Sequence, residues 1–251
     1  MFPGNRNNNF KKTMENIPTK TFDFQQGEVL LFDKNIDWTS FDLVRKVRSI
    51  LCQTLLIKKL KVGHAGTLDP RATGLMIVCT GKFTKKIESF QAGEKEYIAT
   101  IKLGATTPSF DMETEEDATY PTSQIDRENT EEVLKNFTGK ILQVPPLFSA
   151  VHINGKRAYS LARKGETVKL ESRSVFIKEI EIQKFSPTEM ILRIVCGKGT
   201  YIRSLARDIG EALNSGAYLT ALRRTRIGDF KVEEAMTIEE FKEKTNYFVT
   251  N

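Results

Sequence analysis

The chain has 251 residues, of which 39% are hydrophobic and 28% charged, and its formal net charge is +6 with a sequence pI of about 9.1. A chain of this length forms one large or two small domains and buries roughly three quarters of its unfolded surface, so it folds without a metal or a disulfide. No stretch approaches ~18 uninterrupted apolar residues, so no membrane span is expected. The excess of cations indicates an anionic partner, with nucleic acid ahead of a membrane surface.

The cysteines and histidines are few and scattered. Cys52, Cys79 and Cys196 each lie within an apolar pattern, and only two histidines are present. Zinc needs about four grouped ligands, which this set does not supply. An odd number of buried-looking thiols indicates a reducing, cytoplasmic location. Residues 1–20 are polar and Asn-rich, without the apolar centre of a signal peptide, and we expect them to be a disordered lead-in.

The first predicted elements are a strand over residues 28–33, a turn over 34–38 and a helix capped by Thr39 or Ser40. Apolar residues recur at helical spacing along that helix, at Phe41, Val44, Val47, Leu51 and Leu55. The basic cluster at 58–61 follows. It is either a solvated surface segment or a phosphate contact.

Residues 63–74 read GHAGTLDPRATG and lead into an apolar run over 75–79. This pattern predicts a tight loop that enters a buried strand. The three glycines, Gly63, Gly66 and Gly74, allow backbone angles or a close ligand approach that a side chain would block. Pro70 favours an extended backbone at Asp69. The stiff loop either presents Asp69 as a catalytic carboxylate or uses it to cap its own backbone.

The middle of the chain predicts a short helix over 84–90, a strand around Tyr97 to Leu103 and an acidic loop over 104–116. Asn129 and Glu132 have the spacing of a capping box, which begins a helix that runs to Phe137 and ends at Gly139. Aromatic and basic residues interleave over 143–166. This segment is either an RNA-binding segment or a helical hairpin that faces the core.

The last third predicts strands over 168–184, 189–196 and 218–227, with a helix over 201–214 between the second and third. Ile202, Leu205, Ile209 and Leu213 share one face of that helix. Thr237 and Glu240 cap a final short helix. Strands outnumber helices and mostly do not alternate with them. The prediction is therefore an α+β fold with one mixed, largely antiparallel sheet.

The segment 63–74 resembles the signature of the TruB family of tRNA pseudouridine synthases. Further segments resemble family motifs in the family's order, between about residues 27 and 239: Lys95-Glu96-Tyr97, Leu103-Gly104 with the loop ending in Asp111, 145–151, 155–159, 198–205 and 222–225. One motif alone arises by chance, whereas several in order make the resemblance specific.

The resemblance implies a pseudouridine synthase fold, in which helices and RNA-binding loops flank a mixed sheet. It implies isomerisation of uridine 55 in the T loop of tRNA, by a monomer without metal or organic cofactor. The catalytic domain would cover residues 21–251, with an RNA-gripping insertion at about 143–166. The family often carries a C-terminal PUA domain, which the dozen residues after Glu239 are too few to form.

The resemblance also implies roles for single residues. Asp69 would be the nucleophile or base near C1′. Arg203 would pair with it bidentately and lower its pKa, and Asp111 would steady this pair. Tyr97 would stack on the uracil, with its hydroxyl helping to remove a proton. The implied substrate and RNA contacts are Lys34, His64, Lys156, Arg157, Tyr201 and Leu222.

The sequence departs from the family in the loop over 106–111, where Pro108 replaces a frequent Asp. The register of Asp111 therefore stays open at this stage. Two other functions also stay open. One is a tRNA-binding or folding-assisting protein without catalysis, against which the retention of Asp69, Tyr97 and Arg203 together argues. The other is a pseudouridine synthase that acts on a different RNA.

Overall fold

The computed structural model describes residues 22–148, 152–153, 156–157 and 170–245. The predicted lead-in over 1–20 lies outside the described residues. So does most of the predicted insertion after residue 148. No helix in the described ranges is long and apolar enough to cross a membrane.

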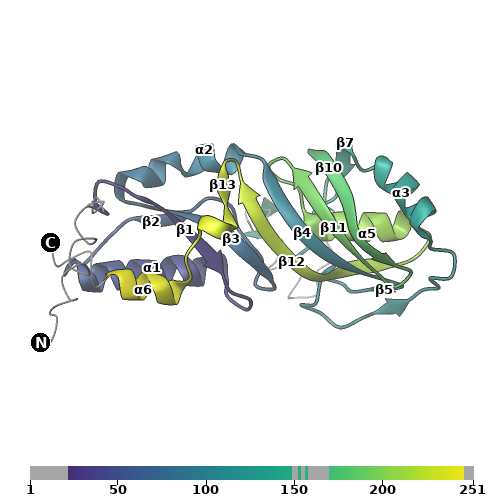
Figure 1. The fold of residues 1–251 in the computed structure, drawn as a ribbon, viewed down its shortest axis with the longest axis horizontal. Coiled ribbons are helices and arrows are strands. Elements are labelled where there is room, and N and C mark those ends of the chain that lie inside the picture. The colour runs from purple at the N-terminus through teal and green to yellow at the C-terminus, as the bar shows by residue number, and fades with distance from the viewer. Residues whose placement is uncertain (1–21, 149–151, 154–155, 158–169, 246–251) are drawn as a thin grey trace, which may run out of the picture.

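One twisted sheet runs through the molecule (Figure 1). In spatial order its strands are β1 (Val29–Lys34), β3 (Ala72–Thr80), β12 (Ala217–Ile227), β4 (Lys95–Leu103), β11 (Glu189–Cys196), β10 (Arg173–Ser186) and β7 (Gly139–Gln143). Two short strands, β2 (Val62–His64) and β13 (Phe230–Lys231), pair with β3 and β12. Among the strand pairs of this sheet in the described residues, only that of β12 with β3 is parallel. The predicted α+β fold with a mixed, mostly antiparallel sheet is confirmed.

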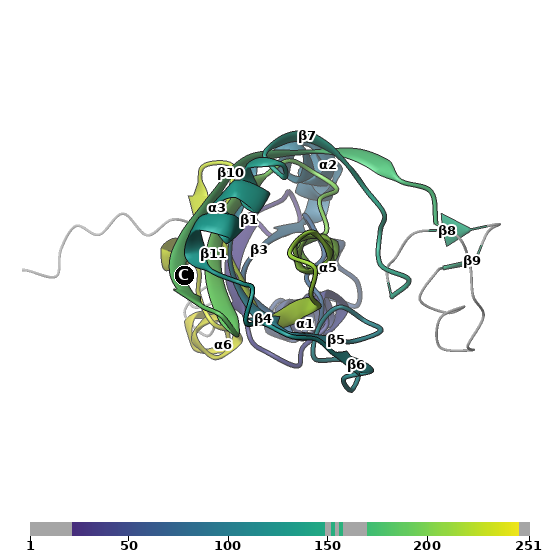
Figure 2. The same cartoon turned by 90° about the vertical axis from the view of Figure 1, so that its right-hand side faces the viewer.

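The helices are α1 (Ser40–Thr54), α2 (Ile87–Ala92), α3 (Arg127–Lys135), α5 (Ile202–Ala212) and α6 (Ile238–Thr245), with short 3₁₀ turns η1 (Gly81–Lys86) and η2 (Val232–Glu234). Figure 1 shows α1 and α6 side by side at the β1 end of the sheet, and α3 and α5 at the other end. Viewed along the molecule, α5 lies within the curve of the sheet (Figure 2).

The main core fills the space between the sheet and helices α1, α5 and α6. The predicted face of α5 is confirmed, since Ile202, Leu205, Ile209 and Leu213 are all buried in it. A smaller apolar cluster lies on the other side of β3 and includes Leu75. Because both of its faces are covered, β3 has a continuous apolar run rather than an alternating one.

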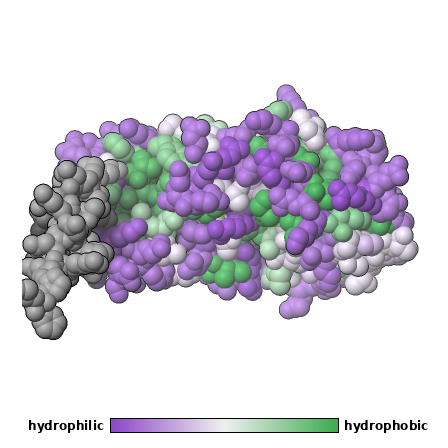
Figure 3. All heavy atoms as spheres, viewed as in Figure 1, coloured by the Kyte–Doolittle hydropathy of each residue, from purple (hydrophilic) through white to green (hydrophobic). Residues whose placement is uncertain are grey.

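The outer face of β4, β11 and β10 is polar. Arg193 lies within 2.9 Å of both Glu96 and Glu179 there, and 3.4 Å from Glu181. Polar side chains cover most of the face in Figure 3, and apolar ones show between them in separate groups. An antiparallel sheet that is covered on one side alternates in this way between buried and solvated residues.

Several predicted details of the helices are wrong. Phe41 is 63% exposed, because it lies in the first turn of α1 on the side away from the sheet; Leu43 and Ile50 are buried instead. Asn129 does not cap α3. Asp126 does, accepting a hydrogen bond from the Asn129 amide at 2.8 Å, so the helix begins earlier. Gly139 begins β7 rather than ending α3.

Two helix starts follow the sequence closely. Thr39 caps α1: its hydroxyl accepts from the Asp42 amide at 3.0 Å, and its amide donates to the Asp42 carboxylate at 3.2 Å. The predicted pair Thr237 and Glu240 caps α6, with hydrogen bonds in both directions. These caps satisfy amides that the first helical turn leaves without a partner.

Two strand pairs lie outside the main sheet. β5 (Ala105–Thr106) pairs with β6 (Ala118–Thr119) within the acidic loop, and β8 (His152–Ile153) pairs with β9 (Lys156–Arg157). Figure 2 shows β8 and β9 standing away from the body of the molecule. A single bridge between Asp111 and Leu219 fastens the acidic loop to β12.

Candidate active site

The Asp69 loop, residues 65–71, joins β2 to β3 and rests on the start of α1. The Ser40 hydroxyl donates to the Leu68 carbonyl at 2.9 Å and accepts from the Leu68 amide at 2.8 Å. The Asp37 amide donates to the Pro70 carbonyl at 2.9 Å. These bonds fix the backbone on both sides of Asp69. The sequence-based prediction of a stiff loop is therefore confirmed.

The glycines of this region serve chain packing. A Cβ at Gly74, where φ is +104°, would lie 2.2 Å from the Arg224 carbonyl oxygen, and one at Gly63 would lie 2.7 Å from the Ile87 side chain. A Cβ at Gly66, where φ is +100°, would lie 3.4 Å from the Arg224 guanidinium. The sequence left two roles open for these glycines, unusual backbone angles or clearance for a ligand. The structure supports unusual backbone angles at Gly66 and Gly74, and it shows that Arg224 lies close to both.

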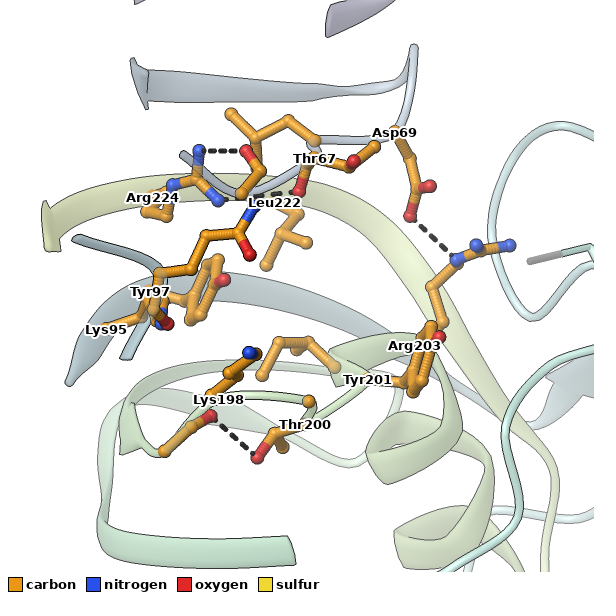
Figure 4. A pocket seen from close by; sticks show the side chains of 16 residues that line it. Thr67, Asp69, Lys95, Tyr97, Lys198, Thr200, Tyr201, Arg203, Leu222 and Arg224 are labelled. Atoms are coloured by element: carbon orange, nitrogen blue, oxygen red, sulfur yellow. Dashed lines mark hydrogen bonds and ion pairs between the residues drawn. The ribbon is translucent and has the colours of Figure 1, made fainter. Parts of the chain in front are cut away.

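The Asp69 carboxylate points at Arg203, which lies in the first turn of α5 (Figure 4). The Arg203 Nε lies 2.9 Å from Asp69 Oδ2, and Arg203 is 3% exposed. Its two terminal nitrogens donate elsewhere, to the Ser109 carbonyl at 3.2 Å and the Phe148 carbonyl at 2.8 Å. The expected bidentate pairing is therefore wrong, because the fork of the guanidinium is occupied by backbone.

Asp111 also lies beside Arg203, with its Oδ2 3.6 Å from the same Nε that pairs with Asp69. The Ser109 hydroxyl donates to Asp111 Oδ1 at 2.6 Å, and the Glu113 amide donates to the same atom at 2.9 Å. The loop with Pro108 thus still brings Asp111 to the arginine. The Arg203 charge is shared between two carboxylates, of which Asp111 is buried and Asp69 is 37% exposed at its side chain.

The electrostatics of Asp69 differ from the expectation. Burial raises the pKa of Asp69, and the nearby Asp111 carboxylate acts in the same direction. Arg203 and Lys34 oppose this change, but the net direction of the pKa is upward. Arg203 therefore acts on the pKa in the expected direction, but the desolvation of the carboxylate outweighs it.

Asp69 opens onto a cavity of about 390 Å³ (Figure 4). Its described lining includes Tyr97 from β4, Leu222 from β12, Tyr201 at the start of α5, and Lys198. The floor is apolar and ring-lined, while charged groups lie at its sides. Apolar walls with a few charged groups are typical of a cavity that binds a small organic group.

Tyr97 is 9% exposed and its ring faces the cavity. Burial raises the pKa of Tyr97, and Arg224 acts against this effect. The phenol is therefore protonated at neutral pH. It can donate a hydrogen bond and stack, but it is a poor base in the resting enzyme.

Two of the predicted RNA contacts, Lys34 and His64, do not line the cavity in the described residues. Lys34 is 1% exposed and its Nζ donates to the carbonyls of Asn35, Trp38 and Pro70, so it supports the loop instead of meeting phosphate. Burial lowers its pKa to about 8. His64 lies in β2 opposite Val78, outside the described lining of the cavity.

Tyr201 and Leu222 both line the cavity, as the resemblance implies. The Tyr201 amide and carbonyl are held by the Gln143 side chain at 2.8 and 3.1 Å. Lys156 and Arg157 pair with Ile153 and His152 in the backbone of β9 and β8, and their side chains lie outside the described part of the structure.

The sequence analysis missed two cations of the site, Arg224 and Lys95. Both are buried and line the cavity, and the Lys95 Nζ donates to the carbonyls of Gln91 and Gly93 at the end of α2. The available signal for Arg224 was its place in β12. Arg224 lies two residues after Leu222 in the strand, so its side chain is on the same face as Leu222, which was already assigned to the site.

A mixed sheet that holds a carboxylate–arginine pair beside a base-sized cavity defines a pseudouridine synthase. Two family models match the chain: TruB family pseudouridylate synthase (N terminal domain) over residues 53–202, and tRNA pseudouridylate synthase B C-terminal domain over 203–250. The chain belongs to the TruB family of pseudouridylate synthases. It is an enzyme that converts uridine to pseudouridine in tRNA.

Similar proteins agree with this family. The chain is 61% identical to tRNA pseudouridine synthase B of Phocaeicola vulgatus over 220 residues, covering 88% of this chain and 94% of the relative. It is 52% identical to the protein of that name from Flavobacterium johnsoniae over 222 residues, covering 88% and 97%. A solved chain of a Cbf5-Nop10-Gar1 complex matches with a TM-score of 0.67 and 28% identity. The match covers 90% of this chain and 56% of the solved one.

Proposed function

We propose that this enzyme isomerises the uridine at position 55 in the T loop of tRNA, with Asp69 as the reacting carboxylate. The supporting observation is that, of the two carboxylates beside Arg203, Asp69 lines the cavity of about 390 Å³ and Asp111 does not. We therefore expect C1′ of a bound nucleotide to lie next to the Asp69 carboxylate.

In the proposed reaction the N1–C1′ bond breaks and the uracil turns over within the cavity. A new bond then forms from C5 to C1′. On balance C5 loses a proton and N1 gains one, so substrate and product are isomers. Asp69 acts either as the nucleophile at C1′ or as the base at the neighbouring sugar carbon. Both routes need the ionised carboxylate, which Arg203 favours.

The uracil of a folded T loop is stacked, so the proposed mechanism begins with its extrusion. Unstacking costs a few kcal/mol, which stacking in the enzyme partly repays. Tyr97 and Leu222 are the groups we assign to that role, because both line the cavity and lie on neighbouring strands, β4 and β12.

Recognition of the T arm is assigned to the segment over 143–166, where aromatic and basic residues interleave. Its described beginning is fastened to α5. The Ser204 hydroxyl donates to the Val144 carbonyl at 2.8 Å, and Arg203 donates to the Phe148 carbonyl. The segment thus starts within contact of the catalytic arginine. We further propose that the enzyme works as a monomer in the cytoplasm, in keeping with its three free cysteines.

The substitution Asp69→Asn tests the role of Asp69. It keeps the size of the side chain and removes its charge. With a T-loop RNA that carries 5-tritiated uridine, we expect tritium release to fall to background while RNA binding changes by less than roughly threefold. Asp229→Asn is the matched control, since Asp229 is an exposed residue in the turn between β12 and β13 and is not part of the described lining of the cavity. Normal tritium release by the Asp69→Asn protein would sink the assignment.

A further inference from the structure

Arg224 is a cation in the protein interior with an exposed fraction of 1%. It lies in β12, where its backbone is opposite Gly74 of β3 on one side and Tyr97 of β4 on the other. Its side chain therefore starts between the strand that follows the Asp69 loop and the strand that carries the cavity tyrosine. Figure 4 shows the guanidinium beside Thr67, above the Tyr97 ring.

The Arg224 guanidinium is satisfied by backbone carbonyls. Its Nε donates to the Leu75 carbonyl at 2.8 Å, and its terminal nitrogens donate to the carbonyls of Gly66 at 3.0 Å and Thr67 at 3.4 Å. None of the ion pairs between described residues includes Arg224. The acceptors precede and follow Asp69 in the chain, two in the Asp69 loop and one in β3. The Arg224 side chain therefore links the loop to the strand that follows it.

The local sequence is shaped to admit this contact. Gly66 and Gly74 both have positive φ; a Cβ on Gly74 would clash with the Arg224 backbone, whereas one on Gly66 would be in ordinary contact with the guanidinium at 3.4 Å. A side chain at Gly74 would force β12 away from β3, since the clash is with backbone at 2.2 Å. The two glycines and the arginine thus form one unit that sets how closely the loop approaches β12.

We propose that Arg224 is a positioning residue for catalysis, which fixes the Asp69 loop relative to Tyr97 and so aligns the carboxylate with the base in the cavity. The inference rests on the proposed role of Asp69. Burying the guanidinium against neutral carbonyls carries a desolvation cost. Its two hydrogen bonds to the Asp69 loop and one to β3 restrain the position of the loop against the sheet. The same charge opposes the effect of burial on the pKa of Tyr97.

The neighbouring Arg223 supplies a matched control. It lies on the same strand, and its guanidinium pairs with Asp33 at 2.6 and 3.0 Å on the half-exposed side. Removing Arg223 therefore takes an arginine and its hydrogen bonds from β12 without touching the Asp69 loop. A general weakening of the sheet would affect both arginine variants in a similar way.

The test compares Arg224→Lys and Arg224→Met with Arg223→Met. It measures the single-turnover rate at saturating tRNA, the Kd for tRNA and the thermal unfolding of each protein. We expect Arg224→Met to lose roughly 100-fold in rate and Arg224→Lys at least about 10-fold, with Kd within about threefold of the wild type, because misplacement by about 1 Å has costs of this size. Arg223→Met should stay within about threefold in both.

Rates for folded Arg224 variants that match Arg223→Met would overturn the inference. Where Arg224→Met does not fold, Arg224→Lys decides, because it keeps the charge and the aliphatic stem. Hydrogen exchange of peptides covering residues 63–74 is a readout independent of activity, and it should accelerate in Arg224→Lys but not in Arg223→Met. Unchanged exchange would equally contradict the proposal. A wild-type protein inactive on T-loop RNA would instead defeat the proposed function.

Discussion

Asp69 combines two opposed electrostatic effects in one side chain. Burial raises its pKa, while Arg203 at 2.9 Å favours the ionised form. Because the reaction needs the carboxylate, the rate should fall as pH drops through the pKa of Asp69. That acid limb should lie above the pKa of about 3.9 of an ordinary Asp.

The substitution Arg203→Gln sharpens this prediction. It removes the charge that opposes burial, so the pKa of Asp69 should rise further and the acid limb should move to higher pH. Profiles of single-turnover rate against pH, measured for both proteins at saturating RNA, check the direction. An acid limb that moves down, or stays in place, would contradict the electrostatic account. The same raised pKa also affects stability. Because the folded pKa of Asp69 lies above the unfolded one, the free energy of unfolding should decrease as pH rises through these two values, and the loss is complete above the folded pKa.

At the scale of elements, the Asp69 loop depends on the start of α1. Ser40→Ala would leave the Leu68 amide and carbonyl without their buried partner, so we expect a loss of about 1–3 kcal/mol in unfolding free energy and a lower rate. Thr39→Ala removes the helix cap next to it and should cost about 1 kcal/mol, with little change in rate. Denaturant unfolding and single-turnover assays of both variants make the comparison. Equal effects of the two variants on rate would show that the Ser40 contact does not govern the loop.

The elements also show what the sequence can predict. Strand β11 matches its predicted range because its apolar alternation is clear, and α5 buries its predicted face. The Asn129 error has a local cause, since it depends on where the helix begins, which competing caps decide. The Phe41 error concerns the buried face of a helix whose start was predicted correctly, because that face runs through Leu43 and Ile50. The role of Arg224 needed the register between β12, β3 and β4. That long-range pairing brings residues 74, 97 and 224 together, and no local pattern states it.

At the scale of the whole molecule, the two family models meet at residue 202, yet the fold does not divide there. The match over 203–250 contains β12, which lies between β3 and β4 in the sheet. A chain that ends at residue 202 should therefore fail to fold, because it loses a central strand together with Arg203. Circular dichroism and thermal scans of the truncated and full chains test this. A cooperative unfolding transition for residues 1–202 would contradict it.

The central claim concerns which uridine is changed. The most direct measurement is a map of pseudouridine in tRNA from cells that lack this protein, compared with cells that contain it and with cells that contain only the Asp69→Asn form. The account predicts loss of pseudouridine at position 55 in the first and third, with the other positions unchanged. Retention of pseudouridine at position 55 in cells without the protein, or a loss confined to another position, would contradict it.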